Sequence, residues 1–452
     1  MIRLPVVPWQ HLLAGLILVI LFVPIRRYSL PADLPFQLEF YRLFVAALVL
    51  GWIGSLLVDR RVRLRRTGFE GPLAVILGGA IASIVVNPGR VAETSAEVNK
   101  SLMFLFSFVV VLYLTVSGVR RLSDVDFLAR FLVAGGAVVS VFAIVEARTG
   151  FNVFNHLSTV MPFLRDLGDV GGFQRVGTAT LRVFGSAQHP IALSAALVML
   201  APLAIYLARR HRQRRWLACA LVIGVACAST VSRTGVVMFL VVAVVFLCLR
   251  PRETVRLWPA LLAALVVTHF ALPGTLGAIK NSFFPPGGLI AEQRGSADSS
   301  GSGRLADLGP ALDLWTRQPV MGQGYGTNVV NPDAGGIEAN IFDDQWLGTL
   351  LATGIVGFLG WAWFFVRAIR RFGQEAARDP SERGWLLTAL TAGIAAYGVG
   401  MLTYDAFAFI QVTFLLFLFV GLGSVVMETD SPDVAPESEP VPLGARSVTH
   451  SA

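Results

Sequence analysis

The chain has 452 residues, of which 55% are hydrophobic and only 15% are charged, and its mean hydropathy is +0.66. A soluble domain of this size does not need so many apolar residues to fill its core, so the composition excludes an ordinary soluble protein. The net charge of +8 comes from short arginine clusters between apolar runs. Such clusters set membrane topology more simply than they bind nucleic acid, and we expect no nucleic-acid partner.

Apolar runs recur from Trp9 almost to Met427, and one spanning helix needs about 20 such residues. They predict an all-α polytopic membrane protein with about twelve transmembrane helices in one membrane domain, residues 1–427. The expected spans are 9–25, 37–58, 71–86, 101–118, 125–145, 190–208, 216–231, 234–249, 257–278, 345–366, 385–403 and 407–426.

The connections between these spans alternate between arginine-rich and arginine-poor. The arginine-rich set is Arg60–Arg66, Arg120–Arg121, Arg209–Arg215, Arg250–Arg256 and Arg367–Arg383. By the positive-inside rule these connections are cytoplasmic, which predicts a multi-pass protein of the inner (plasma) membrane with both termini in the cytoplasm. Residues 428–452 are rich in Pro, Glu and Ser and are expected to form a disordered cytoplasmic tail.

Two connections on the outer side, about 146–189 and 279–344, are too long to be simple links, so function is expected there. The second is a large extracytoplasmic loop between helices 9 and 10 that is expected to carry short helices. Within it, Ser302 is expected to cap a helix that carries Arg304 in its first turn. A glycine-rich turn, Gln318–Gly326, follows after a proline, and a polar stretch, Asp343–Gln345, precedes the return into the membrane.

Taken in this order, the motifs resemble the O-antigen ligase and polymerase family of integral membrane enzymes. The resemblance includes the Gly354–Gly357 helix start and extends to Arg182–Pro190 and Ser232–Gly235, covering about residues 180–365. It implies an enzyme that joins lipid-linked glycans without a metal or a cofactor. The family typically carries a His-Asn pair where this chain has Asp343-Asp344, and that histidine is assigned a catalytic role in the lipopolysaccharide ligases.

The donor that the resemblance implies carries a diphosphate at the membrane interface, and guanidinium groups bind phosphate oxygens through two donors at once. We expect Arg233 and Arg304 to act in catalysis, and Asp343 to serve as the general base in place of the family histidine. The candidate substrate-binding residues are Arg182, His189, Asp344 and Arg90. No zinc-ligand cluster, P-loop or dinucleotide fingerprint occurs in a credible context, so no metal or cofactor is expected.

Several of these residues have a simpler structural interpretation. Arg233 lies in a turn between two spans, from which its side chain can reach lipid headgroups. Arg182 can pair with Asp166 or Asp169, and His189 can be a structural residue at the membrane interface. Among other charges, Glu39 is expected to pair with Arg42 one turn later, and Asp405 is expected to be a solvated turn residue.

The preferred function is transfer of a polyprenyl diphosphate-linked glycan to a glycan or lipid acceptor in cell-surface polysaccharide assembly, by either a polymerase or a ligase. The alternative is a secondary transporter or flippase of lipid-linked sugars, since twelve spans with both ends inside fit the major facilitator plan. The large outer connections favour the enzyme. A third possibility, a structural scaffold, predicts no effect when single arginines are changed.

Overall fold

A computed structural model describes residues 8–31, 38–58, 63–168, 181–285, 287–288, 290, 304–327 and 344–429. Asp343, Ser302 and almost all of the predicted tail lie outside this set. The described chain is mainly α-helical and contains a short antiparallel pair, β1 (Tyr28–Ser29) with β2 (Arg165–Asp166). The all-α prediction is therefore confirmed in its essentials.

Each of the predicted spans overlaps a helix over most of its length. In chain order these helices are α1 (Trp9–Phe22), α2 (Phe40–Val58), α3 (Glu70–Val86), α5 (Ser95–Gly118), α6 (Leu122–Thr149), α8 (Pro190–His211), α9 (Arg214–Ser229), α10 (Arg233–Leu249), α12 (Trp258–Ala271), α16 (Gln345–Arg378), α17 (Glu382–Gly400) and α18 (Ile410–Glu428). Among the described residues, seven helices are long and apolar enough to cross a membrane, one of them formed by α12 with the preceding turn, and α1, α3 and α10 are shorter apolar helices. The protein is multi-pass, and the number of twelve crossings stays a prediction.

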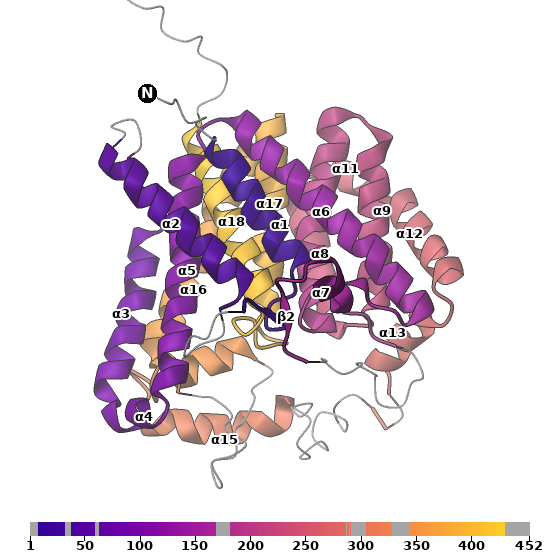
Figure 1. The fold of residues 1–452 in the computed structure, drawn as a ribbon. Helices are drawn as coiled ribbons and strands as arrows, with labels where there is room; N and C mark the ends of the chain where they lie inside the picture. The colour runs from indigo at the N-terminus through magenta and orange to yellow at the C-terminus, as the bar shows by residue number, and fades with distance from the viewer. Residues whose placement is uncertain are drawn as a thin grey trace, which may run out of the picture.

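The short helices, with the exception of α11, lie toward one end of the bundle. They are α4 (Pro88–Glu93), η1 (Val153–His156), α7 (Leu157–Val160), α11 (Pro251–Val255), α13 (Thr275–Phe283) and α15 (Arg304–Arg317). Figure 1 shows α4 and α15 at the bottom and α7, α13 and β2 above them, between the bottom and the middle of the view, whereas α11 lies near the top. The two long connections thus reach the same face, as their predicted placement on one side of the membrane requires.

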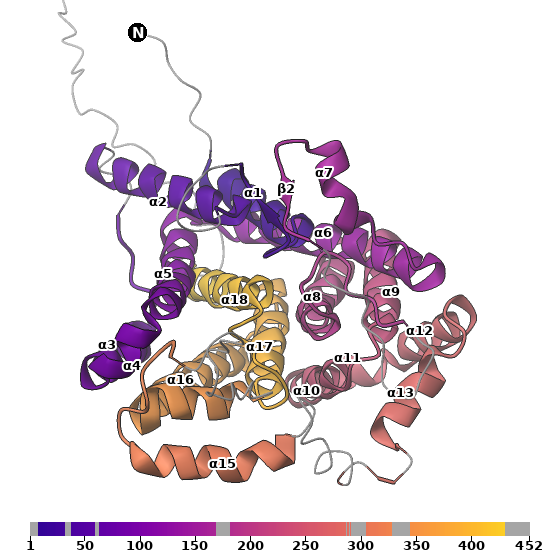
Figure 2. The same ribbon diagram turned by 60° about the horizontal axis from the view of Figure 1, so that its bottom comes forward.

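The helices differ strongly in burial. In α18, 94% of the most apolar window is buried inside the protein, compared with 22% in α2 and 6% in the segment that contains α12. Figure 2 shows α17 and α18 in the middle of the molecule with the other helices around them. Exposed apolar residues on α2 and α12 therefore face the lipid, whereas α18 forms the protein core.

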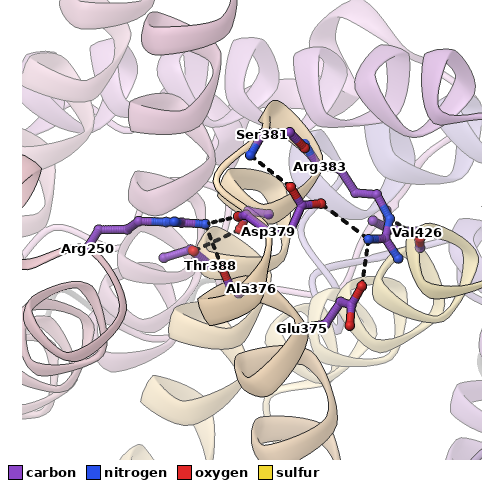
Figure 3. Close-up of polar contacts among 9 residues, drawn as sticks. Arg250, Glu375, Ala376, Asp379, Ser381, Arg383, Thr388 and Val426 are labelled. Atoms are coloured by element: carbon purple, nitrogen blue, oxygen red, sulfur yellow. Dashed lines mark hydrogen bonds and ion pairs between the residues drawn. The ribbon is translucent and has the colours of Figure 1, made fainter. Parts of the chain in front are cut away.

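The arginine-rich face is held together by hydrogen bonds to helix ends. Arg250, after α10, donates to two backbone carbonyl groups at the end of α16, at 2.7 and 2.6 Å. Arg383, at the start of α17, pairs with Glu375 at 2.8 Å and donates to the carbonyl oxygen of Val426 at 3.1 Å (Figure 3). The last carbonyl groups of a helix have no partner within the helix and carry partial negative charge, so these arginines stabilise the ends of α16 and α18.

Helix α16 is broken at Gly354, whose φ of 63° and ψ of −163° are outside the helical range. The glycine-rich turn after α15 packs against this break. The amide of Ile355 donates to the carbonyl oxygen of Pro319 at 2.9 Å, and the amide of Gln323 donates to that of Leu351 at 2.8 Å. A helix break leaves backbone groups without partners, and the turn supplies those partners. The turn therefore fixes α15 relative to the first segment of α16.

Two side chains, one in α3 and one directly after it, also bond to the place where the glycine-rich turn meets the break in α16. The hydroxyl of Ser83 donates to the carbonyl oxygen of Ala352 at 2.6 Å, and the side-chain amide of Asn87 donates to that of Gly322 at 3.0 Å. Gly322 also has a positive φ, 68°, because its backbone passes directly over the broken helix. Three segments that are distant in the sequence thus meet at one polar junction.

The geometry of the break predicts that only glycine fits at position 354. Alanine there would adopt a conformation that only glycine tolerates, and its Cβ would overlap the carbonyl oxygen of Val320. We expect Gly354→Ala to destabilise the protein by about 2 to 5 kcal/mol, measured as a lower thermal unfolding midpoint in detergent. Gly348→Ala in the same helix is the control, since its Cβ would meet nothing closer than 3.7 Å. Equal midpoints for the two variants would contradict this account of the break.

Candidate functional site

Arg233 is the first residue of α10 and follows a tightly held turn. The Ser232 hydroxyl caps the helix by accepting a hydrogen bond from the amide of Gly235 at 3.3 Å. Val231, just before it, has a positive φ of 47°, which is strained for a β-branched residue. The Arg233 side chain is half-buried. Strain held in place by its surroundings is frequent at functional sites, and here it sets the direction in which the chain enters α10.

Arg182 lies beside the same turn. Its Nε donates to the carbonyl oxygen of Thr230 at 3.2 Å, and its side chain is half-buried. Asp166, one of its two expected partners, pairs with Arg27 at 3.3 Å instead, and Asp169 lies outside the described residues. The guanidinium group of Arg182 is thus anchored to the turn that directly precedes Arg233.

His189 caps α8 in this region. Its Nδ1 accepts a hydrogen bond from the amide of Ile191 at 3.1 Å, and its ring stacks on that of Phe409 with centroids 5.7 Å apart. Burial, and secondarily the charge of Arg182, lower the pKa of His189 to about 4. The imidazole is therefore neutral at physiological pH, and the hydrogen bond to Nδ1 assigns its proton to Nε2. In this state the Nε2–H group of His189 can donate a hydrogen bond.

The turn between α17 and α18, residues 401–409, joins these elements to α16. The Thr403 hydroxyl donates to that of Thr234 at 3.0 Å, and the amide of Gln345 donates to the carbonyl oxygen of Met401 at 2.8 Å. Asp344 caps α16 by accepting from the amide of Leu347 at 3.1 Å. This turn therefore connects the start of α10 to the start of α16.

The sequence predicted a short turn here but not its contacts with α10 and α16. Asp405, expected to be a solvated turn residue, lies in this turn and is partly exposed. The available signal was the polar and aromatic stretch Tyr404–Phe409 between two strongly apolar spans. The expected pair of Glu39 and Arg42, by contrast, forms as predicted, with 3.2 Å between nitrogen and oxygen.

The N-termini of three helices are therefore all in contact with the 401–409 turn. His189, Ser232 and Asp344 cap α8, α10 and α16, and the 401–409 turn touches all three helix starts through Phe409, Thr403 and Met401. Helix N-termini present N–H donors and partial positive charge. Together with Arg182 and Arg233 they form a region suited to a polyanion. We call this region the anion site.

Arg90 belongs to a different group of contacts. Its guanidinium donates to the side-chain oxygen of Gln323, whose amide nitrogen donates to the carbonyl oxygen of Leu314 at 2.8 Å. Arg90 thus helps to fix the glycine-rich turn to α15.

The predicted short helix with Arg304 in its first turn is confirmed as α15, which lies beside α16 in Figure 2. The contact is apolar: Ala311 packs with Leu347 and Leu351 of α16, close to the cap at Asp344. The side chain of Arg304 and the whole of Asp343 lie outside what the structure describes. Across the described residues, no group of three or more His, Cys, Asp or Glu side chains is placed to hold a metal ion.

A comparison with protein families supports the resemblance seen in the motifs. Residues 217–362 match the family model of the O-antigen ligases. The matched O-antigen ligase region contains α10, α15, the glycine-rich turn and the first segment of α16, and with them Arg233, Arg304 and Asp343. Arg90, Arg182 and His189 precede it. No curated protein matches the chain.

The low pKa of His189 predicts a pH-dependent stability. Between pH 6.5 and about 4, this imidazole binds a proton in the unfolded chain but stays neutral in the folded chain. The stability that the protein gains from the buried, neutral His189 is therefore complete above pH 6.5 and is lost as the pH falls toward 4. The loss is at most on the order of 3 kcal/mol. We expect the unfolding midpoint of the wild type to drop more than that of His189→Gln between pH 7 and pH 4.5. Parallel curves for the two proteins would show that the histidine is not protected from protonation.

Proposed function

We propose that this protein is a membrane glycosyltransferase that transfers a glycan from a polyprenyl diphosphate carrier to a hydroxyl group of a second glycan or a lipid. The observation that carries the proposal is the anion site, where Arg182, Arg233 and three helix N-termini meet beside a neutral histidine. A diphosphate is the group in such a donor that needs this positive potential. The O-antigen ligase match over residues 217–362 supports the same substrate class.

The proposed reaction is a single displacement. Asp343 accepts the proton of the acceptor hydroxyl, whose oxygen attacks the anomeric carbon of the donor sugar. The bond from that carbon to the diphosphate oxygen breaks, and its electron pair leaves with the diphosphate. Arg233, Arg304 and the helix N-termini stabilise the charge that develops on the leaving group. Inversion at the anomeric carbon follows from one displacement.

We place the anion site outside the cytoplasm. The opposite face carries the arginine-rich helix ends, including Arg250 and Arg383 (Figure 3), and an excess of arginine marks cytoplasmic loops. Both chain termini are then cytoplasmic, and the large loop that carries α15 faces the side on which surface polysaccharides are assembled.

Changing the arginines tests the leaving-group role. In vesicles that contain the purified protein, a polyprenyl diphosphate-linked glycan and a glycan acceptor, Arg233→Gln and Arg304→Gln should each lower the transfer rate by about 10² to 10³-fold, because each removes a donor to developing charge. The readouts are elongated glycan and released polyprenyl diphosphate. Arg317→Gln, at the exposed far end of α15, is the matched control and should transfer at the wild-type rate. If Arg233→Gln and Arg304→Gln both keep the control rate, the role assigned to them is wrong.

Replacing carboxylates tests the base. Asp343→Asn cannot accept a proton and should lower the transfer rate by at least about 10²-fold with unchanged membrane abundance. Asp313→Asn, an exposed carboxylate on α15, is the control for charge loss on the same face. A fully active Asp343→Asn protein would remove this residue from the mechanism.

The same vesicles separate transfer from transport. Movement of the donor across the bilayer without any joined product would contradict the enzyme and favour a flippase.

A further inference from the structure

A second cationic region lies on the opposite face of the molecule from the anion site. A cavity of about 470 Å³ opens along the last turns of α16, and its lining includes four arginines: Arg367, Arg370, Arg371 and Arg378. Residues 363, 367, 370, 374 and 378 follow one another at intervals of three or four, so they form one stripe along the helix. The cavity is therefore a groove along this stripe, which we call the arginine groove.

Two of the arginines hold the groove in shape. The Nε of Arg367 donates to the carbonyl oxygen of Gly68 at 2.6 Å, and Arg371 donates to that of Thr67 at 3.2 Å. Both acceptors lie in the segment that leads into α3. These bonds tie α16 to the start of α3, and each uses only one of the several N–H groups of its guanidinium.

The side chains of the other two arginines are exposed. Arg370 and Arg378 are exposed and make no hydrogen bond or ion pair with any residue that the structure describes. Glu375, the acidic residue of the lining, is already paired with Arg383 at 2.8 Å (Figure 3). The nearby Glu428 pairs with Arg65 at 3.7 Å. The groove thus has an excess of positive charge that the described protein does not neutralise.

The groove also lies at the boundary of the apolar part of α16. Trp363 and Val366 line one end of the groove, and their exposed fractions are 45% and 51%. The charged residues of the lining begin at Arg367. Tryptophan is enriched at the level of lipid headgroups, and arginine just beyond an apolar span reaches the same level. A ligand in this groove would therefore contact apolar surface at one end and guanidinium groups at the other.

We propose that the arginine groove binds the phosphate headgroup of an anionic membrane lipid, with the adjoining acyl chain against Trp363 and Val366. Charge complementarity and the mixed lining both favour this occupant over a free anion, which would make no use of the apolar end. The site is separate from the anion site and does not depend on the transferase activity.

Lipid binding can be measured directly by native mass spectrometry of the full-length protein in detergent. With equimolar dioleoylphosphatidylglycerol and dioleoylphosphatidylcholine, the wild type should retain the anionic lipid preferentially. The double variant Arg370→Gln/Arg378→Gln should bind it about tenfold or more weakly, since each arginine near a lipid surface contributes measurably. Arg252→Gln/Arg256→Gln, two exposed arginines of the α11 segment on the same face, is the charge-matched control and should bind as the wild type does.

A second variant keeps every arginine in place. Gln374→Glu introduces a negative charge into the exposed stripe and should weaken binding of the same lipid while the unfolding midpoint stays at the wild-type value. Equal retention of the two lipids by the wild type would overturn the proposal. So would unchanged binding in both groove variants, or displacement of the lipid by millimolar inorganic phosphate, which would indicate a free-anion site.

Discussion

Backbone N–H and C=O groups within a membrane must find partners inside the protein, because lipid offers none. The break in α16 at Gly354 exposes such groups in the middle of an apolar helix. The Pro319–Gly326 turn satisfies them, and this bonding also determines where α15 lies. The position of a helix that carries a candidate catalytic arginine thus follows from hydrogen bonds that close a broken helix. Ser83 and Asn87 extend the same bonding to α3.

Arginine has two physically different tasks in this molecule. At one face, Arg250 and Arg383 bond to the carbonyl ends of helices, where a cation offsets the negative end of the helix dipole. At the other face, Arg182 and Arg233 lie near the positive starts of α8 and α10, where their charge adds to the dipole. The first arrangement is stable by itself, whereas the second becomes favourable when an anion is present. Arg182 combines the two tasks, because its Nε also donates to the carbonyl oxygen of Thr230 at the C-terminal end of α9.

The sequence predicted the spans well and their ends less well. A run of about 20 apolar residues is detectable wherever it occurs, so each expected span has its helix. Hydropathy does not register the continuation of α16 to Arg378, well beyond residue 366, because those turns lie outside the apolar region. The predicted span 257–278 is divided, since Pro273 and Gly274, the latter with a φ of 84°, end α12 and start α13.

The candidate site was predictable as a set of residue types but not as an arrangement. The resemblance to the O-antigen ligase motifs, and the diphosphate donor that it implies, indicated Arg182, His189 and Arg233. The contact of His189 with Phe409 joins residues that are 220 positions apart, and no local pattern reports it. For the same reason the turn at 401–409 looked like an ordinary connection. Arg90 carries the positive charge expected of a diphosphate-binding residue, but its guanidinium is hydrogen-bonded to Gln323 of the glycine-rich turn.

Among the candidate spans of the described residues, the most buried, α18, is also the one that comes last in the sequence. The side chain of Gln411 in α18 donates to the carbonyl oxygen of Ile20 in α1 at 2.9 Å, across 391 residues. During synthesis, α1, α5 and α8 therefore enter the membrane before the element that they enclose exists. The bundle has to remain open on one side until α17 and α18 arrive, and the 401–409 turn that joins the helix starts arrives with them. A ribosome that stops short of this segment leaves a protein with every predicted catalytic residue and no assembled site.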